Sequence, residues 1–171
     1  GVYLVSSSFY LADVAKANFK NADLRYVTFD GANVSGADFK GATVNGATIW
    51  TDGGKMTPEK IHNINLGFVF EGKDYRNKTL TGHNFSNQDL AGANFSGSNL
   101  DGSQFNKAHL EYATFKGAKN VGHCVFNHAS LGNANFEDVY LTSSSFYKAD
   151  VAKANFKGAD LRYVTFGGAN V

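Results

Sequence analysis

The stretch ADVAKANFKNADL at residues 12–24 sets a pattern that most of this chain follows. Large apolar residues stand at Val14, Phe19 and Leu24, and an alanine stands two places before each of them. The same five-residue spacing continues through most of the chain in three runs, at residues 4–49, 75–115 and 121–171. A short fixed period of this kind predicts a stacked repeat architecture.

The period of five matches neither an α-helix nor a half-buried strand, so the backbone must turn a corner in every unit. The large residue and the alanine before it are both expected to point inward. Asn or Asp commonly separates them, as in Ala17-Asn18-Phe19 and Ala22-Asp23-Leu24, and Gly often stands two places after the large residue. These residues favour turns, because Asx side chains bond nearby backbone and Gly accepts a positive φ. Each unit is therefore predicted to hold one short extended piece and one tight corner.

The unit Ala-(Asn/Asp)-(Leu/Phe)-x-x resembles the pentapeptide-repeat family, and about nine tenths of the chain carries it. The resemblance implies an all-β fold, a right-handed quadrilateral β-helix with four pentapeptides in each coil. Neighbouring coils would lie about 4.8 Å apart, which is the spacing of hydrogen-bonded strands.

Phenylalanine tends to occupy alternate units, so at four units per coil the aromatic rings would fall on two opposite sides. Leu and Val would line the other two sides. We expect the phenylalanines to form a core ladder and to have no further role. The residues assigned to this ladder are Phe9, Phe19, Phe29, Phe39, Phe85, Phe95, Phe105, Phe115, Phe126, Phe136, Phe146, Phe156 and Phe166.

Length and composition favour a single extended domain with two interruptions. The larger interruption contains Thr57-Pro58, which reads as a helix start with Thr57 as N-cap and Pro58 at the first helical position. A short helix here would cover the open end of a coil stack. One extra residue shifts the register and predicts a bulge. The predicted organisation is repeat coils at 1–49, a linker or short capping helix at 50–69, and repeat coils at 70–171 with a register shift near 119–121.

Composition excludes several classes of function. Sixteen Lys and Arg residues face 15 Asp and Glu residues, so the net charge of +1 gives little support for direct binding of nucleic acid. No stretch approaches the roughly 20 apolar residues of a membrane span, so we expect no membrane partner. The single cysteine, Cys124, stands at a small inward position and is expected to be a buried spacer. A reducing, cytoplasmic location fits this pattern, and no secretory signal is visible.

No catalytic constellation, cofactor motif or metal-ligand spacing is visible, so we expect a protein that is not an enzyme, with no cofactor and no metal. The histidines have no cysteine or carboxylate companion at ligand spacing. His83 takes an inward small-residue position, and His109 takes the Asx position. We interpret all five as structural or solvated, namely His62, His83, His109, His123 and His128.

An internal duplication is the most unusual feature after the period. Residues 2–34 and 139–171 agree at every position except Val5/Thr142, Leu11/Lys148, Asn21/Gly158 and Asp30/Gly167. Outward positions drift freely in ordinary repeats, so this identity indicates recent copying or construction. One hypothesis makes Met56 a former start and Gly1–Lys55 a former C-terminal end.

The duplication leads to an expectation about assembly. The coil that ends at Val171 would present an uncovered edge that is ready to hydrogen-bond, and Ser35–Ile49 of a second molecule would carry the matching shape. The chain is therefore expected to form a homo-oligomer through its coil ends, as a closed assembly or as a filament.

Two functions follow from these expectations. The first is a non-enzymatic scaffold or protein-binding solenoid that self-associates through its coil ends. The alternative, implied by the quinolone-resistance branch of the family, is interaction with DNA gyrase as an acidic mimic of duplex DNA, although the net charge of +1 lacks the surplus of carboxylates that such a mimic needs. Five tyrosines could form a protein-binding face, or could only cover neighbouring backbone: Tyr10, Tyr26, Tyr112, Tyr147 and Tyr163.

Overall fold

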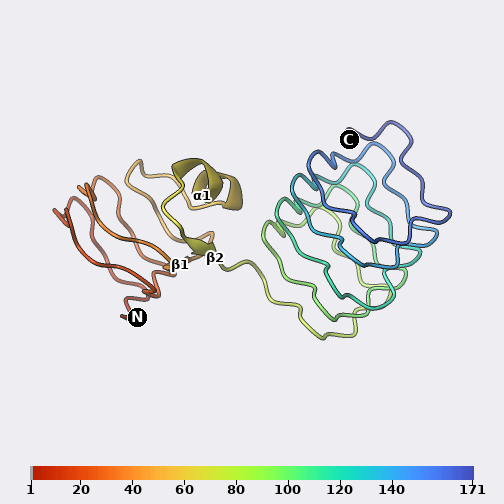
Figure 1. The fold of residues 1–171 in the computed structure, drawn as a ribbon, viewed down its shortest axis with the longest axis horizontal. Coiled ribbons are helices and arrows are strands. Elements are labelled where there is room, and N and C mark those ends of the chain that lie inside the picture. The colour runs from red at the N-terminus through yellow and green to blue at the C-terminus, as the bar shows by residue number, and fades with distance from the viewer. Residues whose placement is uncertain (1) are drawn as a thin grey trace. The chain divides into compact units, whose positions relative to one another are not determined.

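The computed structural model describes residues 2–171, and the chain divides into two compact units, Gly1–Glu71 and Gly72–Val171. Each unit is a stack of four-sided coils, drawn in red to yellow for the first and in green to blue for the second (Figure 1). The sequence suggested one extended domain, and the chain instead ends one stack at its interruption and begins another.

Parallel pairing between residues 20 apart builds both stacks. Ser8 pairs with Thr28 in the first unit, and Ser145 pairs with Thr165 in the second. Twenty residues are four pentapeptides, so each coil has four sides. The predicted right-handed quadrilateral β-helix is therefore confirmed. Most sides are single bridges, and the continuous strands among the described residues are β1 (Thr43–Val44) and β2 (Val69–Phe70), which pair in parallel.

Each corner is a tight turn that begins at the large inward residue. After Phe9, for example, the N–H of Ala12 donates to the carbonyl of Phe9 at 3.0 Å, and Leu11 between them has a φ of 54°. A positive φ at the third residue is the pattern of a type II turn. Asx side chains support the corners as predicted, since Asp13 Oδ1 accepts from the N–H of Ala15 at 3.0 Å.

Large residues from successive coils stack to form the four inner walls, which we name sides A to D in chain order. In the second unit, side A holds Tyr75, Phe95, Phe115, Phe136 and Phe156; side B holds Leu80, Leu100, Val121, Leu141 and Leu161; side C holds Phe85, Phe105, Phe126, Phe146 and Phe166; and side D holds Leu90, Leu110, Leu131, Val151 and Val171. Through the duplication, the first unit places Phe19 and Phe39 on side A, Leu4 and Leu24 on side B, Phe9 and Phe29 on side C, and Val14 and Val34 on side D.

The aromatic rings on sides A and C form two ladders. Within a ladder the rings are nearly parallel, as for Phe105 and Phe126, whose centroids lie 4.8 Å apart. Between ladders they meet edge to face, as for Phe115 and Phe126 at 5.7 Å and 89°. Such pairs add about 0.5–1.5 kcal/mol each beyond the area that they bury. The ladders therefore fix the spacing of the coils as well as filling their interior.

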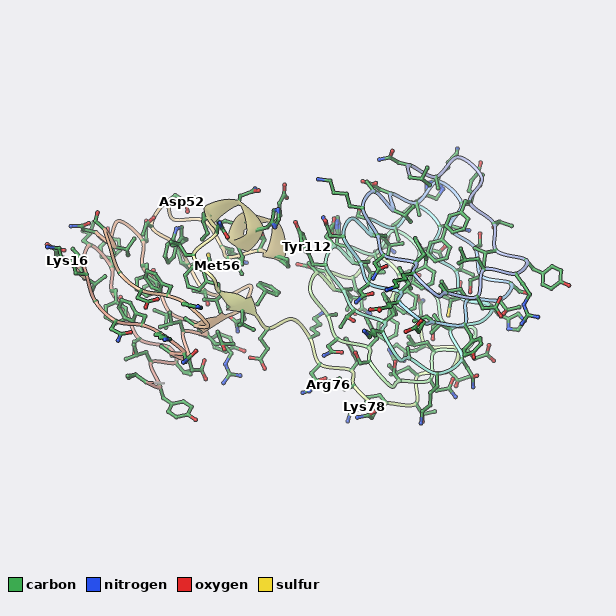
Figure 2. All side chains as sticks on the ribbon, in the orientation of Figure 1. Lys16, Asp52, Met56, Arg76, Lys78 and Tyr112 are labelled. Carbon is green, nitrogen blue, oxygen red and sulfur yellow. The ribbon has the colours of Figure 1, made fainter. Side chains whose placement is uncertain are left out.

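Helix α1 (Pro58–Ile64) closes the last coil of the first unit, as the sequence predicted (Figure 1). The Thr57 side chain accepts from the N–H of Lys60 at 3.1 Å, and Pro58 stands at the start of the helix. Ile61 and Ile64 pack against the core of this unit. Met56 is fully buried there, whereas Lys16 projects from a corner (Figure 2). The hypothesis that Met56 is a former start stays a hypothesis.

Two registers differ by one residue from the regular spacing. Between residues 104 and 125 the pairing interval is 21, because one residue is inserted near Asn120, whose φ is 46°. The first unit has a similar insertion that the sequence reading missed, since Thr28 pairs with Ile49. Ile49 is therefore not the inward residue that we expected. Trp50 occupies the inward place, with its ring centroid 5.6 Å from that of Phe29.

A substitution at Gly41 tests whether the corners of the coils require a residue that adopts a positive φ. Its φ is +73°, and an added Cβ would collide with Asn21 Oδ1 from the coil before. Gly41→Ala should lower the unfolding free energy of the first unit by about 1–2 kcal/mol. Gly46→Ala, which has no positive φ and no atom within 4 Å of an added Cβ, should change it by less than about 0.5 kcal/mol. Urea unfolding followed by Trp50 fluorescence measures both; equal effects would contradict this account of the corner.

Candidate functional site

The first and last coils of the chain present open edges. We call residues 2–21 the entry coil, which begins the first unit, and residues 152–171 the exit coil, which ends the second unit. Their inward residues are less buried than the same residues inside a stack. Leu161 in the exit coil is 38% exposed, whereas its duplicate Leu24 is fully buried. Both coils thus leave apolar core residues accessible.

Exposed large apolar residues gather at these two coils. The entry coil has five of them and the exit coil three, whereas residues 73–92, the first coil of the second unit, have none among the described residues. Those in the entry coil are Val2, Tyr3, Val5, Tyr10 and Leu11, and those in the exit coil are Leu161, Tyr163 and Val171. Clusters of exposed apolar side chains are a mark of interaction surfaces.

The exit coil also leaves backbone donors unpaired. Within the described residues, the N–H groups of Leu161, Phe166 and Gly168 make no hydrogen bond. Their duplicates in the first unit are paired, since Leu24 donates to Thr43 at 2.8 Å and Phe29 donates to Ile49 at 2.9 Å. The exit coil therefore presents the same backbone edge that its duplicate in the first unit uses to bind a further coil. Within the described residues, no further coil covers this edge of the exit coil.

The entry coil presents the complementary edge. In the part of the chain that the structure describes, the N–H and carbonyl of Ser8 are unpaired. Its duplicate, Ser145, donates to the carbonyl of Cys124 at 2.9 Å and accepts from the N–H of Phe126 at 2.7 Å. The sequence reading missed Val2, Tyr3 and Val5 in this surface. Their positions give the signal, because no backbone group within residues 2–171 pairs with the entry-facing edge of this coil.

The five candidate tyrosines do not share one side. Tyr10 and its duplicate Tyr147 follow side C, whereas Tyr26 and its duplicate Tyr163 precede side C in their own units. Tyr112 lies at the corner between sides D and A of the second unit. Tyr10 and Tyr163 belong to the entry and exit coils and are 61% and 82% exposed. A binding role for the five stays a prediction, and two of them lie on the open ends.

The histidines are spread over different corners. His83 is exposed instead of inward, because its coil is the first of its unit, although its ring lies 4.4 Å from that of Phe85. His123 Nδ1 lies 3.0 Å from Asp101 Oδ1, a carboxylate neighbour that the sequence reading missed because the two residues are one coil apart. Among the described residues, no group of three or more His, Cys, Asp or Glu side chains is arranged to hold a metal ion.

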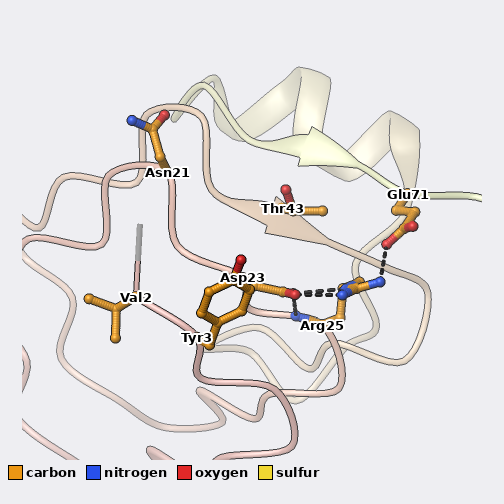
Figure 3. Close-up of a pocket in the computed structure, with 7 residues that line it drawn as sticks. All are labelled: Val2, Tyr3, Asn21, Asp23, Arg25, Thr43 and Glu71. Atoms are coloured by element: carbon orange, nitrogen blue, oxygen red, sulfur yellow. Dashed lines mark hydrogen bonds and ion pairs between the residues drawn. The ribbon is translucent and has the colours of Figure 1, made fainter.

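A shallow hollow lies on side B of the first unit, lined by Val2, Tyr3, Asn21, Asp23, Arg25, Thr43 and Glu71 (Figure 3). Arg25 Nη1 lies 2.8 Å from Glu71, and Arg25 Nε donates to Asp23 at 2.8 Å. The hydrogen bond from Arg25 lowers the pKa of Asp23. The charges of this hollow are thus satisfied by one another, so it offers little to a ligand.

The geometry defines a β-helical repeat protein. Two family models match it: one described as a pentapeptide repeat region, at residues 93–166, and one described as pentapeptide repeats in eight copies, at residues 7–48 and 79–105. The chain belongs to the pentapeptide-repeat family, as its sequence pattern indicated. Members of this family are generally non-enzymatic structural repeat proteins. No match is found among curated proteins.

Several solved structures resemble the chain. HetL, a pentapeptide repeat protein involved in regulation of heterocyst differentiation in the cyanobacterium Nostoc sp. strain PCC 7120, is 22% identical with a TM-score of 0.46, covering 99% of this chain and 68% of HetL. A trypsin-treated variant of QnrB1, a plasmid-mediated fluoroquinolone resistance protein, is 20% identical with a TM-score of 0.48, covering 99% and 77%. A protein of the Arabidopsis thaliana thylakoid lumen is 27% identical with a TM-score of 0.30, covering 58% and 65%. These likenesses concern the fold alone.

Within the described residues, no helix has the length and apolar character needed to cross a membrane.

Cys124 supplies a probe of the second unit. It is fully buried as predicted, its Sγ donates to the carbonyl of Leu100 at 3.0 Å, and burial raises the pKa of its thiol to about 12. At about pH 8.5 the folded chain should therefore react with an aromatic disulfide reagent roughly a thousandfold more slowly than the unfolded chain. Absorbance after mixing, with and without urea, measures this ratio. Equal rates would mean that the thiol is accessible.

Proposed function

We propose that this protein is a non-enzymatic scaffold that self-associates through its open coil ends. The observation that carries the proposal is that the exit coil leaves unpaired the same N–H groups that its duplicate uses to hold a further coil. A second copy of the chain supplies coils of the required shape. Edges of this kind pair with other chains unless they are covered.

Apolar contact supports the same function. Eight large hydrophobic residues are exposed on the entry and exit coils, and covering them removes apolar surface from water. The first unit closes its other end with helix α1, so this chain can cap a coil stack where it needs to. We therefore assign assembly to the entry and exit coils, which no helix covers within the described residues. A cytoplasmic location stays a prediction.

Interaction with DNA gyrase, the alternative raised by the sequence, has weaker support. A mimic of duplex DNA needs a surplus of carboxylates, and this chain has 16 Lys and Arg residues against 15 Asp and Glu residues. The QnrB1 likeness, at 20% identity, concerns the fold alone. The open ends therefore favour assembly over gyrase binding.

Light scattering across about a hundredfold dilution tests self-association, because a bimolecular contact dissociates as the concentration falls. The mean mass should rise with concentration and should rise further in sulfate salts, which strengthen apolar contacts. A monomer mass at every concentration, with and without sulfate, would overturn the proposal.

A further inference from the structure

We propose that the exit coil of one molecule stacks on the entry coil of a second molecule, with residues 159–171 paired in register with residues 2–14. This inference rests on the proposed function and specifies which ends meet and how. The occupant of the exit coil is a second copy of this chain, bound head to tail.

Both surfaces of this contact already exist, covered, inside the molecule. Residues 22–34 duplicate residues 159–171 except at one position, and their exit-facing edge carries the coil that contains Thr43 and Ile49. Residues 139–151 duplicate residues 2–14 except at two positions, and their entry-facing edge sits on the coil that contains Cys124 and Phe126. Each half of the proposed interface is therefore a coil surface that this sequence demonstrably packs.

The backbone groups match one another in this register. Leu161, Tyr163, Phe166 and Gly168 provide N–H groups for the carbonyls of Tyr3, Val5, Ser8 and Tyr10, and the N–H of Ser8 meets the carbonyl of Val164. In the described residues all of these groups are unpaired. The duplicates show the same bonds formed, as when Phe126 donates to Ser145 at 2.7 Å and His128 donates to Tyr147 at 2.9 Å. The contact therefore continues the ladder of the coils.

The side chains match as well. Leu161 meets Leu4 on side B, Phe166 meets Phe9 on side C, and Val171 meets Val14 on side D. The duplicates show both of these ring faces covered: Phe146, the duplicate of Phe9, stacks on Phe126 of the coil before it with centroids 4.7 Å apart, and Phe29, the duplicate of Phe166, meets Trp50 of the coil after it with centroids 5.6 Å apart. Asp160 and Arg162 face Tyr3 and Val5, so no like charges oppose one another. The stacking of the aromatic rings on side C and the arrangement of the charges therefore both permit the contact.

One competing arrangement has to be distinguished. The first coil of the second unit, residues 73–92, also presents an entry-facing edge, and it would place Phe85 on Phe166. Two of its four inward residues, Phe85 and Leu90, are each 1% exposed, the other two, Tyr75 and Leu80, are partly buried, and it has no exposed large hydrophobic residue among the described residues. Stacking there would bury less apolar surface than stacking on the entry coil. The entry coil is therefore the favoured partner.

Disulfide trapping tests the register. The duplicate of Ser8, Ser145, forms a parallel bridge with Val125 of the coil before it, and the duplicate of Thr165, Thr28, forms one with Ile49 of the coil after it. Ser8 and Thr165 of two molecules should therefore come within disulfide reach. A mixture of Ser8→Cys chains and Thr165→Cys chains should form a heterodimer under mild oxidation at least about tenfold faster than Ser8→Cys mixed with Asp160→Cys, which lies on the next side. Every variant also contains the buried Cys124, so any reaction of this thiol contributes equally to the rates that are compared.

The outcomes separate the inference from the proposed function. Preferred trapping of Thr165→Cys with Asn84→Cys would overturn the entry-coil contact and leave coil-end association standing. Equal trapping of every pair would overturn the register. No trapping in a chain that stays monomeric at every concentration would overturn both.

Proline substitution gives a second, independent readout. The N–H of Ser8 is unpaired in the described chain, so Ser8→Pro loses only the long hydrogen bond from the Tyr10 N–H to the Ser8 hydroxyl, at 3.3 Å, and puts a ring into the proposed contact. It should weaken association at least about tenfold, measured by light scattering. Thr79→Pro makes the matched change on the edge of residues 73–92, where the Thr79 N–H is also unpaired, and should leave association unchanged. The reverse result would overturn the inference.

Discussion

The parallel hydrogen bonding between residues 20 apart is the constraint on which the rest of the structure depends. It requires four corners in each coil, and nearly every corner holds a residue with a positive φ, such as Leu11, Gly41 or Tyr163. Successive corners lie one above another, so a side chain at one corner leans over the next, as Asn21 does over Gly41. The same spacing sets the aromatic rings of each ladder face to face, about one strand separation apart. Backbone pairing, corner chemistry and core packing are thus one periodic arrangement, and each supports the other two.

Each coil of such a stack contacts only the coil before it and the coil after it, so unsatisfied interactions are found at the ends of the stack. The first unit covers its last coil with Met56, α1 and Phe68. The entry and exit coils have no such cover within the described residues, and they hold most of the exposed apolar side chains. The duplication adds a comparison that few proteins allow. Leu24 and Leu161 have the same flanking sequence, and one is fully buried whereas the other is 38% exposed, which isolates the effect of a covering coil.

Much of the fold could be predicted from the sequence, because a period of five fixes where the chain turns and which residues face inward. The N-cap at Thr57 and the burial of Cys124 followed from local chemistry in the same way. The sequence-based predictions failed where the five-residue spacing continued in the sequence but the backbone register changed in the structure. Ile49 keeps the period, yet an inserted residue moves Trp50 into the core, since the large indole fills the space between Phe29 and Phe39. His123 and Asp101 meet across a coil, which spacing along the chain does not reveal. The exposure of the entry and exit coils needed the structure, because it is seen only when a residue such as Leu161 is compared with its buried duplicate.

Amide hydrogen exchange of the exit coil tests most directly the claim that the chain associates through its coil ends. It reports on the backbone N–H groups that are unpaired in one molecule and would be hydrogen-bonded in the assembly. The amides of Leu161 and Phe166 are compared with those of Leu24 and Phe29 at low and high protein concentration, and the differences at Asn21/Gly158 and Asp30/Gly167 allow the two copies to be told apart. The account predicts fast exchange at Leu161 and Phe166 in dilute solution, slowing at least about tenfold as the chain is concentrated, with slow exchange at Leu24 and Phe29 throughout. Exchange at Leu161 and Phe166 that stays fast at every concentration would contradict it.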